Sequence, residues 1–167
     1  LPGTALSKGH GTGNDFVLIA DPDGTQEIGP EAVAVRCDRH QGIGADGLIR
    51  AVRSRHLAEG RDLLAIAPEA EWFMDYRNGD GSLSEMCGNG VRVFVHFIIE
   101  QGLVTLGTGQ SLTIGTRAGL KVITRSTDGY AVDMGPWEFI FPDQAVAKAM
   151  DSLVNAEGLK VPRPALS

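Results

Sequence analysis

One cysteine stands where a glycine-rich loop meets an apolar segment, and its side chain is well suited to acid–base chemistry. Cys87 ends the run DGSLSEMC, and Gly88, Asn89 and Gly90 lead from it into VRVFVHFII. If a helix begins here, its unpaired N–H groups and the positive end of its dipole favour the thiolate. The glycines would let a ligand approach the backbone, and the same N–H groups would bind a carboxylate. We therefore interpret Cys87 as a candidate general acid or base.

The other cysteine has a different setting. Free cysteines are most often small buried apolar residues. Cys37, within VAVRCDRH, has no glycine beside it, so we expect it to be structural. The N-terminal LPGTALSKGH contains no apolar signal region, and we expect two reduced thiols in a cytoplasmic protein rather than one disulfide.

The segment that follows the candidate thiol decides how that thiol is held. It alternates well enough to be a strand. However, Arg92, His96 and Glu100 fall four apart and would form one polar stripe on a helix. Gly102 stands where the C′ residue of such a helix is expected. We predict a largely buried helix over about residues 88–101.

Short β-branched or aromatic runs bounded by turn residues predict the strands of a sheet. They cover residues 16–20, 48–52, 72–77, 112–116, 120–124 and 130–134. Ala118-Gly119 separates two of these runs as the turn of a hairpin. Pro30 opens a short helix that extends to about Arg36. Near the C-terminus, the apolar spacing predicts an amphipathic helix from Asp143 to about Ala156.

Composition and charge argue against several classes of function. The net charge of −6 and the pI near 5.1 argue against a nucleic-acid partner. No stretch approaches 18 consecutive apolar residues, so we expect no membrane span. We expect no metal site, because the four histidines lack ligand spacing; they are His10, His40, His56 and His96.

Two charged clusters have simple interpretations. The basic cluster of residues 50–62 also contains Glu59 and Asp62, so we expect it to be a solvated face; its arginines are Arg50, Arg53, Arg55 and Arg61. Asp21 and Asp23, in DPDGTQE, lack the later ligands of a calcium loop, so we interpret them as part of a turn.

Several segments together resemble one known family. They are KGHGTGNDF at Lys8–Phe16, DRHQGIGADG at Asp38–Gly47, NGDGSLSEMCGNGVR at Asn78–Arg92, IGTRAG at Ile114–Gly119 and VDMG at Val132–Gly135. In this order and at this length they resemble the diaminopimelate epimerases over roughly residues 6–135. The resemblance is far more specific than a lone glycine pattern.

The resemblance implies an α+β fold with a mixed or antiparallel curved sheet wrapped around a central helix. Residues 1–135 would form the first epimerase domain, and residues 136–167 the start of a second domain or a connecting segment. Family members bind substrate in a cleft between two such domains, and the last strand returns to the first domain. We expect the natural chain to continue, and the present one to be inactive alone with an unpaired sheet edge.

The resemblance also implies the chemistry. The enzyme would interconvert LL- and meso-diaminopimelate without a cofactor, by means of two cysteines on opposite faces of the α-carbon, and would form a homodimer. Cys87 would be the first-domain cysteine. Gly88 and Asn89 would offer N–H groups to the substrate carboxylate, while Asn14 and Asn78 would form hydrogen bonds with the substrate. Many relatives carry a glutamine contact at the position of Gly47, so no role is assigned there.

Two other functions stay open at this point. Cys87 would serve as a nucleophile in an acyl-transfer enzyme if the fold brought His10 or His40 to it as a base. A non-catalytic binding or assembly module on the epimerase half-fold is the other alternative. A racemase-like relative is disfavoured by KGHGTGNDF.

Overall fold

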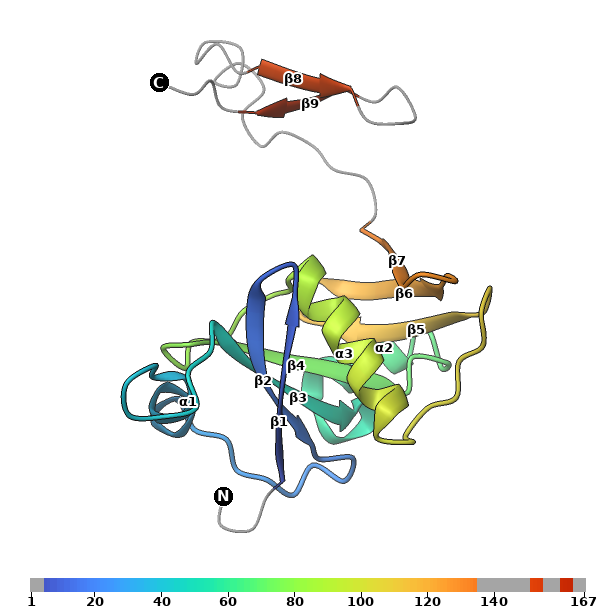
Figure 1. Ribbon diagram of the computed structural model, residues 1–167. Helices are drawn as coiled ribbons and strands as arrows, with labels where there is room; N and C mark the ends of the chain where they lie inside the picture. The colour runs from blue at the N-terminus through green and yellow to red at the C-terminus, as the bar shows by residue number, and fades with distance from the viewer. Residues whose placement is uncertain (1–4, 135–150, 155–159, 164–167) are drawn as a thin grey trace. The chain divides into compact units, whose positions relative to one another are not determined.

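The computed structural model describes residues 5–134, 151–154 and 160–163. The chain divides into two units, Leu1–Met134 and Gly135–Ser167. In the first unit seven strands form one sheet in the order β1-β2-β3-β4-β5-β6-β7, which curls around a helix (Figure 1). The strands are β1 (Leu6–Gly11), β2 (Asn14–Ala20), β3 (Gly47–Arg53), β4 (Trp72–Asn78), β5 (Ser111–Thr116), β6 (Gly119–Arg125) and β7 (Tyr130–Asp133). The helices are α1 (Pro30–Cys37), α2 (Ala58–Leu64) and α3 (Gly88–Glu100), with a 3-10 turn at Ser54–His56.

The sheet is mixed. Strands β2 and β3 are parallel, as are β4 and β5, and the other neighbouring pairs are antiparallel. Parallel neighbours need a crossover connection, and the two crossovers contain α1 and α3 respectively. The predicted fold class, α+β with a curved mixed sheet around a central helix, is confirmed. Among the described residues, β1 pairs only with β2 and β7 only with β6.

The central helix has the boundaries that its sequence predicts. It buries most of its circumference, while His96 and Glu100 are exposed and Arg92 is half-buried. Gly102 follows the helix with φ 68°, the left-handed C′ conformation that glycine adopts at low cost. Figure 1 shows α3 lying across the sheet, with β1 and β2 on one side of it and β5 and β6 on the other.

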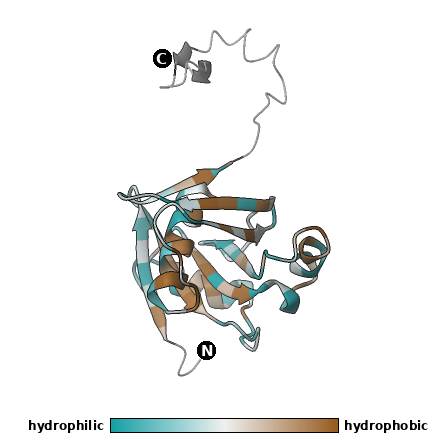
Figure 2. Cartoon of the chain, turned by 90° about the vertical axis from the view of Figure 1, so that its right-hand side faces the viewer, coloured by the Kyte–Doolittle hydropathy of each residue, from teal (hydrophilic) through white to brown (hydrophobic). Residues whose placement is uncertain are grey.

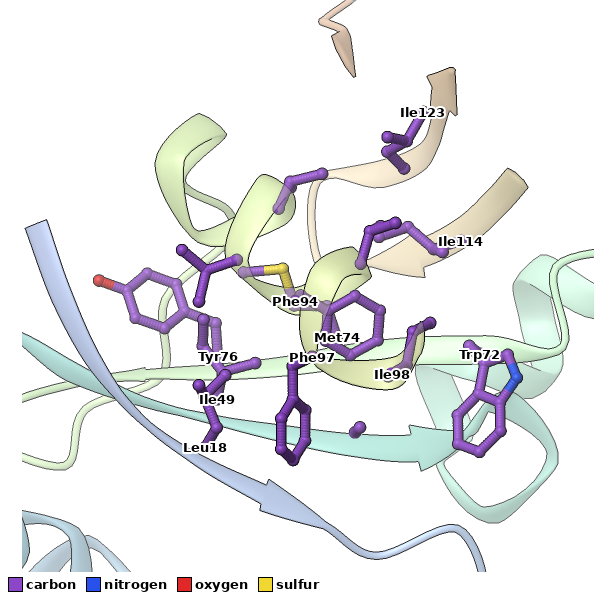
Figure 3. Packing of buried hydrophobic residues seen from close by; sticks show 14 of the residues in the cluster. Leu18, Ile49, Trp72, Met74, Tyr76, Phe94, Phe97, Ile98, Ile114 and Ile123 are labelled. Carbon is purple, nitrogen blue, oxygen red and sulfur yellow. The ribbon is translucent and has the colours of Figure 1, made fainter. Parts of the chain in front are cut away.

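Alternation along the strands builds a core on each face of the sheet. On β2, Phe16 and Leu18 pack toward α3, whereas Val17 and Ile19 pack toward α1, because successive strand side chains point to opposite faces. Figure 3 shows the α3 side, where Phe94 and Ile98 lie among side chains of the sheet. Figure 2 shows brown hydrophobic and teal hydrophilic residues interspersed along the strands.

Some predicted elements need correction. Strand β1 and helix α2 were not expected, since the glycines of KGHGTGND and the charges of AEGRDLL obscure their periodicity. The hairpin loop is Arg117–Ala118, one residue before the predicted turn, since Gly119 pairs with Thr116. A helix was expected over residues 143–156, but Asp151–Val154 form strand β8, which pairs antiparallel with β9 (Lys160–Arg163). The backbone N–H and C=O groups of β8 are paired with those of β9. Residues 143–150 and 155–156 lie outside the described residues.

The basic cluster is also not a simple solvated face. Arg50 is only 7% exposed, and its guanidinium pairs with Asp75 at 2.8 Å and with Asp21 at 3.3 Å. Arg117 also reaches Asp75, at 2.7 Å. Buried charges need such partners. Asp21 does form the predicted turn, accepting the Thr25 N–H at 2.9 Å, but it is buried as a partner of Arg50 as well.

Candidate active site

Cys87 is the N-cap residue of α3, with φ −137° and ψ 126°. Its side chain makes no capping hydrogen bond and is half-buried. The Nδ2 group of Asn14 donates to the sulfur across 3.4 Å. A donor aimed at the sulfur, together with the N-terminal end of a helix, stabilises negative charge there. The thiol predicted to do chemistry therefore lies at a helix N-terminus, with an amide donor at its sulfur.

The β1–β2 hairpin places Asn14 beside this helix end. At the hairpin turn, Thr12 has φ 51° and Gly13 has φ 86°, and the Thr12 hydroxyl donates to Oδ1 of Asn89 at 2.9 Å. A Cβ atom on Gly11 would lie 3.0 Å from the carbonyl oxygen of Asn89. A glycine at this position lets the hairpin approach the first turn of α3 closely enough for both contacts.

A charged clamp of Lys8, Asp15, Arg39 and Asp46 joins the KGHGTGNDF segment to the DRHQGIGADG segment. Arg39 binds the Asp15 carboxylate with both terminal nitrogens, at 2.7 and 3.1 Å, and binds Asp46 at 2.9 Å. Lys8 lies 3.2 Å from Asp15 and donates to the Gly44 carbonyl at 2.7 Å. The hydrogen bonds from Arg39 hold the pKa of Asp15 well below its usual range. The clamp fixes the residue next to Asn14.

Tyr76 lies on the α3 side of β4, in the core cluster against which Cys87 packs. Burial, and then the negative charge of Cys87, raise the pKa of this phenol, so it stays protonated at neutral pH. Figure 3 shows the hydroxyl at the outer end of the ring, away from the apolar cluster. The ring lies where a side chain on Gly47 would be, since a Cβ there would come within 2.6 Å of the ring and 2.5 Å of the Arg77 carbonyl oxygen. The glutamine expected in relatives would therefore displace Tyr76 here.

Asn78 is placed differently from the other predicted site residues. It ends β4 opposite Gly47, and its Nδ2 donates to the Ser82 hydroxyl at 3.0 Å. It lies on the same face of β4 as Tyr76, two residues further along. The described contacts bring Cys87, Asn14, Gly88 and Asn89 together at the end of α3, but none of them joins Asn78 to the thiol.

Sequence reasoning missed three residues around this site. Thr12, Tyr76 and Arg92 each contact or adjoin a predicted site residue. Arg92 was identifiable, because residues three apart on a helix are neighbours and its guanidinium donates to Oδ1 of Asn89. Thr12 and Tyr76 reach the site only through the pairing of strands, which the sequence does not display.

A cavity of about 760 Å³ runs along the polar stripe of α3, and Thr12 and Arg92 are among the residues that line it. It is bounded by β1, by α3 and by the turn before β7, and Cys87 does not line it. One lining residue, His96, lies 3.1 Å from the Tyr130 hydroxyl through its Nδ1. Within the part of the chain that the structure describes, no group of three His, Cys, Asp or Glu residues could hold a metal ion. Nor does any described helix have the length and apolar character to cross a membrane.

The fold and the site together define an α+β domain whose central helix is capped by a half-buried cysteine. The profile of the diaminopimelate epimerase family matches residues 6–140, and the chain belongs to that family. The diaminopimelate epimerase of Thermobifida fusca is 45% identical over 164 residues, which cover 97% of this chain and 58% of that protein. The diaminopimelate epimerase of Streptomyces coelicolor is 51% identical over 132 residues, which cover 78% of this chain and 44% of that protein.

The chain thus spans about half the length of the curated relatives it matches. Among solved structures, the phenazine biosynthesis protein of Bacillus anthracis, of the PhzF family, superposes with a TM-score of 0.48. The two are 20% identical, and the match covers 77% of this chain and 38% of that one.

Proposed function

We propose that this chain supplies one half-site of a diaminopimelate epimerase, which converts LL- to meso-diaminopimelate. Cys87 exchanges a proton with the α-carbon on one face, and a cysteine of a second domain acts on the opposite face. The observation that carries the proposal is the placement of the Cys87 sulfur at the N-terminus of α3, with Asn14 donating to it at 3.4 Å.

The end of α3 suits the charge that this reaction develops. Removing an α-proton builds enolate charge beside the substrate carboxylate, and preorganised N–H donors aimed there stabilise it. The first turn of a helix leaves N–H groups without intrahelical acceptors, and here these belong to Gly88, Asn89 and Gly90. They supply the donors without a metal or an organic cofactor, which accords with a cofactor-independent reaction.

The proton balance requires two sulfur atoms in opposite states. One thiolate takes the α-proton and becomes a thiol, while the thiol on the other face gives its proton to the carbanion and becomes a thiolate. A carboxylate bound beside Cys87 opposes a second negative charge nearby, so a divided thiol/thiolate pair is favoured over two thiolates. Cys37 cannot be the second partner, because it is buried in the core on the α1 side of the sheet.

An acyl-transfer reaction fits the same thiol less well. A cysteine nucleophile needs an adjacent general base, but the hydrogen-bond donor at Cys87 within the described residues is Asn14. Among the described residues, neither His10 nor His40, the candidate bases, forms a hydrogen bond with the Cys87 sulfur. The homodimer implied by the resemblance and the cytoplasmic location expected from the sequence are part of this proposal.

Deuterium incorporation at Cα of diaminopimelate in D₂O tests the proposal. We expect rapid wash-in with the full-length protein, none above background with the present chain alone, and loss in full-length Cys87→Ala. Turnover by the isolated chain would contradict the half-site, and turnover by a folded Cys87→Ala protein would contradict the role of the thiol. A trapped thioester would instead identify an acyl-transfer enzyme.

A further inference from the structure

We propose that Thr12 and Arg92 are positioning residues that orient the side-chain amide of Asn89, so that it presents only its N–H donors to the substrate carboxylate. The inference rests on the proposed function and extends it to residues that contact no substrate themselves. Its basis is a pair of hydrogen bonds: the Thr12 hydroxyl and the Arg92 guanidinium both donate to Oδ1 of Asn89.

The chemistry of arginine fixes which way the amide faces. The two ends of an asparagine amide are hard to tell apart by shape alone, but a guanidinium has donors and no acceptor. The atom of Asn89 that faces Arg92 must therefore be the oxygen. With Thr12 as a second donor, both lone pairs of that oxygen are used. A ligand at Asn89 then meets the Nδ2 group, for which no partner exists among the described residues.

The backbone of Thr12 indicates that this contact is selected rather than incidental. Thr12 has φ 51°, and it is the one described residue other than glycine with a positive φ. A β-branched residue in this region is a genuine outlier, and strain of this kind persists where surrounding contacts hold it. Asparagine or glycine would be the residue expected at such a turn. Threonine contributes a hydroxyl group here, and this hydroxyl forms the hydrogen bond to Asn89.

As a consequence, the N-terminal end of α3 presents hydrogen-bond donors, and no acceptors, to a ligand. The N–H groups of the first turn of α3 and the Asn89 Nδ2 group all recognise an acceptor such as a carboxylate. A substrate carboxamide would bring its own N–H donors against them and leave buried groups unpaired, which is strongly disfavoured. Thr12 and Arg92 would therefore contribute to discrimination between an amino acid and its α-amide.

Kinetics of the full-length protein test the inference. Thr12→Val keeps the shape of the side chain and removes its hydroxyl, and Arg92→Leu removes the other donor, while Thr12→Ser is the matched control. We expect each of the first two to raise KM about 5- to 20-fold with kcat within about 3-fold, since binding that is equal in ground and transition states affects KM. We also expect the ratio of the inhibition constants of the α-amide and α-acid of diaminopimelate to fall by a similar factor.

Restoration by Thr12→Ser of both KM and the inhibitor ratio would support the positioning role. Unchanged KM and ratio in folded Thr12→Val and Arg92→Leu proteins would overturn it, even if their unfolding temperatures fall. If Thr12→Val does not fold, Arg92→Leu and Thr12→Ser decide between these outcomes.

A separate measurement on the present chain does not depend on catalysis. The Nδ2 proton resonances of Asn89 should shift in Thr12→Val and Arg92→Leu but not in Thr12→Ser. If these shifts are absent, the orientation is wrong. If they occur while the wild-type full-length protein shows no epimerisation, the proposed function fails and the orientation stands.

Discussion

The two cysteines of this chain lie at opposite ends of helices and on opposite faces of the sheet. Cys37 is the last residue of α1, 4% exposed, and belongs to the core that includes Val17 and Val33. Cys87 precedes the first residue of α3 and is half-buried, with an amide donor at its sulfur. Burial raises the pKa of the Cys37 thiol, and the nearby Asp15 carboxylate adds to this shift.

The difference shows that placement, rather than residue type, makes one thiol a candidate for proton transfer. A helix C-terminus presents carbonyl groups and the negative end of the dipole, which oppose a thiolate, whereas an N-terminus presents N–H groups. Burial adds a desolvation cost for the charged form at Cys37. The comparison predicts that these two positions will respond in opposite ways to substitution.

The largest contrast is expected in catalysis. In the full-length protein, Cys87→Ala should lower kcat for epimerisation at least about 10³-fold, because a general acid or base contributes about 10²- to 10⁴-fold and this one transfers the reacting proton. Cys37→Ala should keep kcat within about 3-fold. In the present chain, iodoacetamide should modify Cys87 in the folded state and Cys37 only after denaturation. Equal loss of kcat in the two alanine variants would abolish the distinction.

The next largest effect concerns packing on the face of the sheet that carries Cys87. Alanine at Gly47 would place a Cβ 2.5 Å from the Arg77 carbonyl oxygen and 2.6 Å from the Tyr76 ring. We expect Gly47→Ala to lower the free energy of unfolding by about 1–3 kcal/mol, as overpacking does, and to displace Tyr76. Urea denaturation monitored by tyrosine and tryptophan fluorescence measures this change in the free energy of unfolding.

Gly29→Ala is the matched control for this substitution. Gly29 precedes α1 with φ −79°, and nothing lies within 4 Å of its potential Cβ. Gly29→Ala should change the free energy of unfolding by less than about 1 kcal/mol, as expected when alanine replaces an N-cap glycine. Similar losses in both variants would mean that the close contact at Gly47 is not the cause.

Serine substitutions sharpen the comparison of the two thiols through stability. Cys37→Ser should lower the free energy of unfolding by about 1–2 kcal/mol, because a hydroxyl replaces a buried apolar sulfur. Cys87→Ser should raise it by about 0.5–1 kcal/mol, since serine is a preferred N-cap residue and the present cap makes no side-chain bond. Calorimetry of the present chain tests both signs. Destabilisation by Cys87→Ser equal to that at Cys37 would show that the Cys87 sulfur serves packing.

The sequence predicted the parts of the site that are local along the chain. The polar stripe of α3, its C-terminal Gly102 and the capping position of Cys87 all follow from spacing within about fifteen residues. The strands were also predicted where β-branched and aromatic residues dominate. Local pattern was enough in these places, because each element's periodicity is set by which face it buries.

The contacts between motifs could not be predicted in the same way. Arg50 was expected in solvent because its sequence neighbours are charged, but its partners Asp21 and Asp75 lie 29 and 25 residues away. Strand β1 was hidden because glycines weaken the β pattern, although Gly11 is needed where β1 approaches α3. The orientation of Asn89 likewise depends on Thr12, 77 residues distant in the sequence. Such pairs are set by the order and register of the strands, which periodicity does not encode.

The smallest predicted effect concerns the clamp that connects the two cysteine regions. Asp15 follows Asn14, which contacts Cys87, and is bound by Arg39, which follows α1. Its pKa is lowered in the folded protein, chiefly by the hydrogen bonds from Arg39. A carboxyl with a lowered folded-state pKa contributes stability that is fully present above its unfolded value of about 3.9 and is lost as pH falls toward the folded value.

Asp15→Asn should therefore lower the unfolding temperature at pH 7 by no more than about 4 °C, because Arg39 is exposed and screened. The difference from wild type should shrink as pH falls below about 4. Thermal unfolding across pH 2.5–7 measures it, with Asp23→Asn, in an exposed turn, as the control. A difference that stays constant with pH would assign the effect to the shape of the side chain rather than to the charge that joins the two regions.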